Sequence, residues 1–145
     1  MALPASASDY GCECTCPCGC TLTVGYWKNH PDAWRVDALT LGNVGYWPKD
    51  ELLQILDQPA NGNGLVSLAQ QLIAARLNQE RFLEYCPLPS EVYSAMADAD
   101  ALIGWQIVPP FTGAGYMPPS ETSALVDALT AFNEGVLPGW PACPD

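Results

Sequence analysis

Five cysteines alternate with single residues near the start of this chain, and this ladder restricts the possible fold more than any other feature. The cysteine ladder consists of Cys12, Cys14, Cys16, Cys18 and Cys20. In an extended backbone, residues two apart face the same side, so all five thiols line one face. A disulfide across one intervening residue strains the preferred Cα separation and dihedral angle. We therefore expect each ladder cysteine to find a partner far along the chain, in another subunit, or in a metal ion.

Three kinds of partner remain open for these thiols. The first is a disulfide to another subunit or to a distant residue such as Cys143, and the odd total of 7 cysteines leaves at least one thiol free or bound to another molecule. The second is zinc, Cu(I) or an iron–sulfur unit held by Cys12, Cys14, Cys16, Cys18 and Cys20. The third is a staple within the domain, for instance from Cys86 to the C-terminal region. We favour crosslinking and expect no cofactor, because so many cysteines in a short chain indicate an oxidising compartment.

The charge balance excludes two classes of partner. The formal net charge is −11, which repels phosphate backbones and anionic lipid surfaces. No apolar run approaches the roughly 18 residues that a membrane span requires. We expect a secreted, extracellular or cell-surface protein that binds no nucleic acid and does not insert into a membrane.

The pattern along the chain predicts a mainly α-helical domain of four to five helices with a minor β-hairpin. Residues 1–20 form an extended cysteine-rich segment, residues 21–137 the helical domain, and residues 138–145 a proline-rich tail. The longest predicted helix covers residues 65–82, with a broad apolar stripe beside a polar one, and is expected at the centre of the core. The polar stripe contains Ser67, Gln70, Gln71, Ala74 and Asn78.

Shorter elements surround this predicted central helix. Thr21-Leu22-Thr23-Val24 has a strand-like pattern, and Gly42-Asn43 is a turn pair that could close a hairpin between Leu39-Thr40-Leu41 and Val44-Gly45-Tyr46. Further helices are expected after Pro48, after Pro89, and from a cap at Ser120 to a stop at Gly135. The tetrapeptide Val-Gly-Tyr-Trp occurs at 24–27 and again at 44–47, but two copies of four residues do not establish a repeat.

Two sequence motifs stand out in this chain. The first motif is Thr23-Val24-Gly25-Tyr26-Trp27-Lys28-Asn29-His30-Pro31, which follows Cys20. The second is Leu68-Ala69-Gln70-Gln71-Leu72-Ile73-Ala74-Ala75-Arg76-Leu77-Asn78 in the central helix. Together they resemble a domain family of bacterial secreted and surface proteins. The resemblance extends from about residue 20 to residue 133. The family has no established activity, so the resemblance implies location and architecture more than function.

The first motif supplies the candidate interaction or core residues Tyr26, Trp27, Lys28, Asn29 and His30. Where the family often has a histidine in the central helix, this chain has Gln70, so a two-histidine metal site is lost and His30 is the only histidine. We interpret His30 as a helix-capping or core hydrogen-bonding residue. Lys28 and Asn29 suggest an autocatalytic amide crosslink, which would need a buried acid. Adjacent residues point in different directions, which argues against that crosslink.

No catalytic constellation is recognisable, so we expect the protein not to be an enzyme. Five alternating cysteines do not resemble one activated nucleophile with a positioned base. The carboxylates of the later helices are interpreted as solvated helix faces; they are Glu91, Asp98, Asp100 and Asp127. Trp27, Trp34, Trp47 and Trp105 could form a sugar-stacking platform, but we favour burial in the core, where each indole N–H finds a partner.

The sequence therefore predicts an extracellular structural protein that assembles with copies of itself into a fibre, surface layer or matrix. Disulfides from the cysteine ladder would lock the contacts between subunits, and Cys86 and Cys143 are further candidate disulfide residues. Two other functions remain open. One is a thiolate metal-binding or redox module, and the other is an adhesin or carbohydrate-binding domain.

Overall fold

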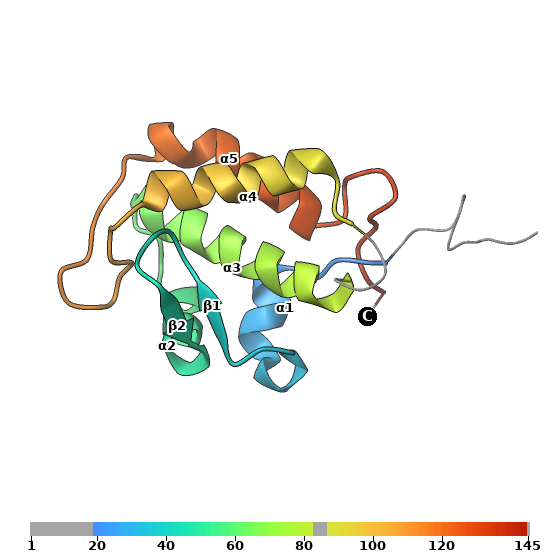
Figure 1. Cartoon of the computed structure of the whole chain (residues 1–145), viewed down its shortest axis with the longest axis horizontal. Coiled ribbons are helices and arrows are strands. Elements are labelled where there is room, and N and C mark those ends of the chain that lie inside the picture. The colour runs from blue at the N-terminus through green and yellow to red at the C-terminus, as the bar shows by residue number, and fades with distance from the viewer. Residues whose placement is uncertain (1–18, 83–86, 145) are drawn as a thin grey trace, which may run out of the picture.

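The computed structural model describes residues 19–82 and 87–144, and it confirms the mainly α-helical fold with a small hairpin. Figure 1 shows the arrangement of its elements. In chain order these are α1 (Val24–Asn29), the 3-10 turn η1 (Pro31–Ala33), β1 (Ala38–Thr40), β2 (Tyr46–Pro48), α2 (Lys49–Leu56), α3 (Gly64–Phe82), α4 (Ser90–Ile103) and α5 (Pro119–Asn133).

Helix α3 runs through the middle of the molecule, as its length and apolar stripe predict. In Figure 1 α4 and α5 lie on one side of it, and α1, α2 and the hairpin lie on the other. None of residues 64–81 is fully exposed, so this helix is covered on all sides. Leu65, Leu68, Leu72 and Ile73 are completely buried in the shared core. Because both outer layers pack on α3, they form one hydrophobic core instead of two.

A polar side chain caps the start of α3, whereas a proline precedes α2, α4 and α5. Asn63 accepts a hydrogen bond from the Leu65 N–H (3.0 Å), which caps α3, and its side-chain amide donates to the Gly115 carbonyl (3.2 Å). The start of α5 differs from the prediction. The residue before the helix is Pro118, which makes no side-chain cap, and Ser120 lies inside the first turn. Proline sets the helical φ without a capping side chain, and this preference outweighs the capping tendency of Ser120. Gly135 follows α5 at φ 78°, as predicted.

The hairpin docks on the end of α4 through its turn. Strands β1 and β2 are antiparallel, with Leu39 opposite Trp47. Gly42 has φ 61°, and a Cβ at this position would lie 2.8 Å from Ile103, so glycine is needed for both conformation and packing. The Gly42 N–H donates to an Asp100 carboxylate oxygen (2.9 Å), and the Asn43 N–H donates to the Gly104 carbonyl (2.8 Å). The predicted turn thus joins the two outer layers.

The segments at the two ends of the described chain meet beside the last turn of α3. The strand-like prediction for residues 21–24 is wrong at its end. Thr21 forms an isolated parallel bridge with Ala142, but Thr23 caps α1 and Val24 is already helical. In the C-terminal segment, Trp140 is buried and its ring centroid lies 5.7 Å from that of Phe132. The end segments therefore pack as part of the domain.

Among the described residues, no helix has the length and apolar character needed to cross a membrane.

Candidate functional site

Helix α1 holds the first motif against the core. The Thr23 hydroxyl accepts a hydrogen bond from the Tyr26 N–H (3.2 Å), which fixes the start of this six-residue helix. Trp27 points into the core with 1% of its surface exposed, whereas Lys28 and Asn29 face solvent. The motif therefore combines one core anchor with a short exposed polar surface.

His30 ends α1 in the way the sequence predicts. Its Nδ1 lies 2.9 Å from the Tyr26 carbonyl oxygen, so a tautomer protonated on Nδ1 donates to one of the unsatisfied carbonyls of the helix end. The imidazole also stacks on the Tyr26 ring, with centroids 4.0 Å apart. His30 is exposed, and its contacts are those of a helix cap.

Four of the tryptophans are core residues and one is not. Trp27, Trp34, Trp47 and Trp140 are all buried, but Trp105 is 76% exposed. The prediction that each buried indole N–H finds a partner is correct for Trp34, which donates to the Trp27 carbonyl (2.9 Å). It is wrong for Trp27 and Trp47, whose indole nitrogens have no hydrogen-bond partner in the part of the chain that the structure describes. Large apolar area therefore outweighs one unmade hydrogen bond at each of these two positions.

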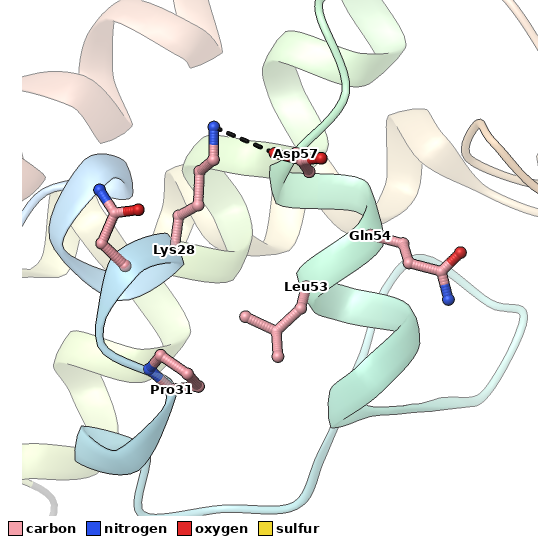
Figure 2. A pocket seen from close by; sticks show the side chains of 6 residues that line it. Lys28, Pro31, Leu53, Gln54 and Asp57 are labelled. Atoms are coloured by element: carbon pink, nitrogen blue, oxygen red, sulfur yellow. Dashed lines mark ion pairs between the residues drawn. The ribbon is translucent and has the colours of Figure 1, made fainter.

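A hollow of about 360 Å³ lies between α1 and α2. Figure 2 shows the residues that line it, which are Lys28, Asn29, Pro31, Leu53, Gln54 and Asp57. The Lys28 ammonium lies 3.3 Å from an Asp57 carboxylate oxygen, but both side chains are exposed, so this ion pair adds little stability. An amide crosslink from Lys28 would need a buried acid, and the carboxylate that faces its ammonium is exposed. The structure thus gives no support to a Lys28–Asn29 crosslink, which the sequence already argued against.

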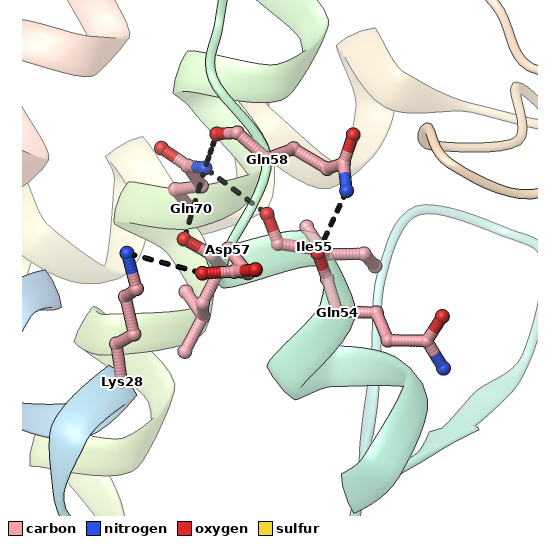
Figure 3. A network of polar contacts seen from close by, with 7 residues as sticks. Lys28, Gln54, Ile55, Asp57, Gln58 and Gln70 are labelled. Carbon is pink, nitrogen blue, oxygen red and sulfur yellow. Dashed lines mark hydrogen bonds and ion pairs between the residues drawn. The ribbon is translucent and has the colours of Figure 1, made fainter.

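Gln70 connects α3 to the end of α2, as Figure 3 shows. Its side-chain nitrogen donates to the carbonyl oxygens of Gln58 (2.8 Å), Ile55 (3.0 Å) and Leu56 (3.4 Å). These carbonyls lie at or just beyond the C-terminal end of α2, where the regular backbone hydrogen bonds of the helix come to an end. Gln70 therefore acts as a structural cap for the neighbouring helix.

The other amides of the predicted polar stripe are also used inside the molecule. Asn78 is completely buried; it accepts from the Leu22 N–H (2.9 Å) and donates to the Leu22 carbonyl (2.8 Å) and to Asn133 (3.0 Å). Asn133 in turn donates to the Gln71 carbonyl and side chain. Sequence reasoning missed this network, although an asparagine on an otherwise apolar helix is the signal that could have revealed it.

The interpretation of Asp100 as a solvated carboxylate is wrong. Three of the carboxylates interpreted as solvated are exposed, namely Glu91, Asp98 and Asp127. Asp100 is half-buried, pairs with Arg76, and accepts from the Gly42 N–H. This carboxylate joins α3, α4 and the hairpin turn, so its role is structural.

Cys20 and Cys143 form a disulfide at the end of the molecule where the two end segments meet. Their Cα atoms are 4.7 Å apart, and 123 positions separate them in the sequence. The Thr21 N–H donates to the Pro141 carbonyl (2.9 Å) and the Cys143 N–H to the Thr21 carbonyl (2.9 Å), so backbone pairing supports the same junction. The other predicted crosslinking residues, Cys12, Cys14, Cys16, Cys18 and Cys86, lie outside the described residues.

Arg81 lies beside this disulfide at the end of α3. Its Nη1 donates to the Cys20 carbonyl oxygen (2.7 Å) and lies 3.2 Å from Cys143 Sγ. Burial lowers the pKa of the Arg81 guanidinium from its ordinary value, and the charge of Arg35 acts in the same direction. An arginine stays protonated at all physiological pH values even so. A fixed positive charge is therefore held against the sulfur atoms.

The described residues contain no group of three or more His, Cys, Asp or Glu side chains placed to hold a metal ion. In this structure Cys20 is part of a disulfide, so its sulfur is not a thiolate ligand. A metal site in the ladder would thus have to rely on Cys12, Cys14, Cys16 and Cys18.

No protein-family model, curated protein or solved structure matches this chain. The resemblance to a bacterial secreted-domain family stays a prediction, and functional inference rests on the geometry described above.

Proposed function

We propose that the protein is an extracellular structural subunit that assembles with copies of itself, with contacts locked by disulfides from the cysteine ladder. The observation that carries this proposal is the Cys20–Cys143 disulfide. A disulfide that closes the domain fits an oxidising compartment, in which further cysteines also become oxidised.

Cysteine arithmetic supports bonds between subunits. The chain has 7 cysteines, and Cys20 and Cys143 pair with each other, which leaves 5. An odd number cannot pair completely within one chain, so at least one cysteine must bond to another molecule or stay a free thiol. Cys12, Cys14, Cys16 and Cys18 lie within eight positions before Cys20 in the sequence. The segment that carries them is therefore connected to the domain next to the disulfide.

The domain itself supports a structural role. Its side-chain amides, including Gln70 and Asn78, hold neighbouring elements together, and its second motif is part of the covered central helix. The ion pair in the α1–α2 hollow is exposed, and His30 caps a helix. The contacts of Gln70, Asn78 and His30 thus hold the domain together.

Non-reducing electrophoresis of native protein tests the proposal. We expect multimers that become monomers when reductant is added. A variant with Cys12, Cys14, Cys16 and Cys18 changed to Ser should remain monomeric, whereas the Cys86→Ser variant should still form multimers. A wild-type protein that runs as a monomer both with and without reductant would contradict covalent assembly. Electron micrographs of the purified protein should then show whether the multimers are ordered.

A second candidate function, carbohydrate binding, is favoured by one observation. Trp105 is 76% exposed, and an exposed indole face can stack on a sugar ring. If glycans bind there, Trp105→Ala should remove the signal from a glycan array, while Tyr93→Ala, which alters another exposed aromatic ring, should retain it. A wild-type protein without array signal would rule this function out.

A further inference from the structure

The Cys20–Cys143 disulfide is electrostatically asymmetric. Arg81 Nη1 lies 3.2 Å from Cys143 Sγ, but its two terminal nitrogens lie 3.9 Å and 3.8 Å from Cys20 Sγ. The guanidinium is fixed in this position by its hydrogen bond to the Cys20 carbonyl oxygen (2.7 Å). Both cysteines are half-buried, so the junction is partly accessible to a reagent.

This asymmetry affects which sulfur leaves more readily when the disulfide is attacked. A thiolate that attacks one sulfur expels the other as a thiolate, and the expelled sulfur carries the negative charge. A nearby guanidinium stabilises a thiolate and lowers the pKa of its thiol, which makes that sulfur the better leaving group. The effect is stronger in a partly buried position than in bulk water, because the charges are less screened.

We propose that Cys20 is a site of mixed-disulfide formation, with Cys143 as the leaving sulfur. An incoming thiolate attacks Cys20 Sγ, a new S–S bond forms between the incoming sulfur and Cys20, and the Cys20–Cys143 bond breaks. The electron pair of the broken bond goes to Cys143, which leaves as a thiolate beside Arg81. One disulfide is exchanged for another, so no oxidant or reductant is needed.

The surrounding contacts keep this exchange reversible. After cleavage, the backbone hydrogen bonds between Thr21 and the 141–143 segment still hold the released cysteine near Arg81. The buried Trp140 anchors the same segment in the core. Cys143 therefore stays close enough to attack the mixed disulfide and restore the original bond. This inference deepens the proposed function, because exchange at Cys20 would let a thiol of a second copy enter without unfolding the domain.

Glutathione is a suitable probe of the exchange site. The protein for this test has Cys12, Cys14, Cys16, Cys18 and Cys86 changed to Ser, so that only the described disulfide remains. After brief incubation with reduced glutathione and acid quenching, peptide mass spectrometry locates the glutathione. We expect it on Cys20 in preference to Cys143 by about fivefold or more. An equal distribution between the two cysteines would overturn the proposal.

Variants of arginine separate the effect of Arg81 from that of overall charge. Arg81→Gln should bring the ratio close to one, whereas Arg35→Gln removes the same charge from an exposed residue and should preserve the preference. Arg81→Lys keeps the charge and should retain part of the preference. A ratio that Arg81→Gln leaves unchanged would contradict the role of the guanidinium.

A second measurement does not depend on how well Arg81→Gln folds. In the fully reduced protein with Arg81 intact, Cys143 should react with iodoacetamide at lower pH than Cys20, because only the thiolate reacts. The opposite order would overturn the proposal.

These assays are independent of assembly. Multimers of the wild-type protein without any preference for Cys20 would refute this inference alone, and a clear preference in a protein that stays monomeric would refute only the proposed function.

Discussion

At the scale of single residues, buried and half-buried amides make connections between elements that apolar side chains cannot make. Asn78 satisfies both backbone polar groups of Leu22, and Gln70 donates to three carbonyls at the end of α2. An amide brings a donor and an acceptor into the interior without the desolvation cost of a charge. Such residues specify which segment packs where, because a wrong partner would leave a buried polar group unpaired.

Gln70→Glu tests this role of the amide. The new side chain has nearly the same shape, but its carboxylate cannot donate and would face carbonyl oxygens. We expect a loss of about 2–4 kcal/mol in the free energy of unfolding, measured with urea. The control is Gln54→Glu, which adds the same charge near the same helix end at an exposed residue and should cost less than about 1 kcal/mol. Equal losses in the two variants would mean that charge, and not donation, explains the effect.

At the scale of elements, sequence pattern predicted the long elements well and the short ones less well. Helix α3 matches the predicted span of residues 65–82 within one residue, because its apolar stripe repeats over several turns. Helix α1 has only six residues, so it offers no such periodicity, and the pattern before it suggested a strand. What makes α1 helical is the Thr23 cap together with Trp27 in the core, and the second of these is a tertiary contact.

The repeated tetrapeptide shows the same limit of local sequence. Val-Gly-Tyr-Trp is helical at 24–27, whereas its second copy leads into strand β2. Both copies bury their tryptophan, so burial is common to the two and backbone conformation is not. Local sequence likewise revealed only part of the candidate site. The cysteines and His30 were visible in the sequence, but Arg81 was not, since only the fold brings it to the disulfide.

Close packing at the start of α3 gives a prediction for one element contact. A Cβ on Gly64 would lie 3.0 Å from the carbonyl oxygens of both Met117 and Pro118. We expect Gly64→Ala to lower the free energy of unfolding by about 1–3 kcal/mol, because the loop before α5 must move away.

Gly25→Ala in α1 is the matched control. A Cβ there has only Thr23 nearby, at 3.8 Å, so the change should be neutral or gain up to about 1 kcal/mol. Thermal and urea unfolding would measure both variants, and a stabilised Gly64→Ala protein would contradict the packing argument.

At the scale of the whole molecule, one covalent bond joins the two ends of the domain. The disulfide encloses α1 to α5 in a single loop, and the end segments pair next to it. Closing such a long loop removes many conformations from the unfolded chain. The folded domain is therefore stabilised without any additional core contact.

Cys20→Ser together with Cys143→Ser measures this contribution. We expect the free energy of unfolding to fall by about 2–5 kcal/mol, with the spectrum of a helical protein retained at room temperature. Both proteins have the other five cysteines changed to Ser, and the comparison protein keeps Cys20 and Cys143. Its stability should fall when reductant is added, whereas reductant should leave the double variant unchanged. If the comparison protein unfolds at the same urea concentration with and without reductant, the disulfide contributes nothing to stability.

The position of the disulfide also determines how the domain responds to mechanical tension. A pulling force applied before Cys20 and after Cys143 passes through one S–S bond and bypasses the residues between them. The sequence separation of 123 between the two cysteines corresponds to roughly 400 Å of fully extended chain, and this segment stays folded under load. Reduction or exchange of the bond would expose the helices to the force, and the segment between the two cysteines could then unfold and extend. The same junction can therefore act as a rigid link or as an extensible one, depending on its oxidation state.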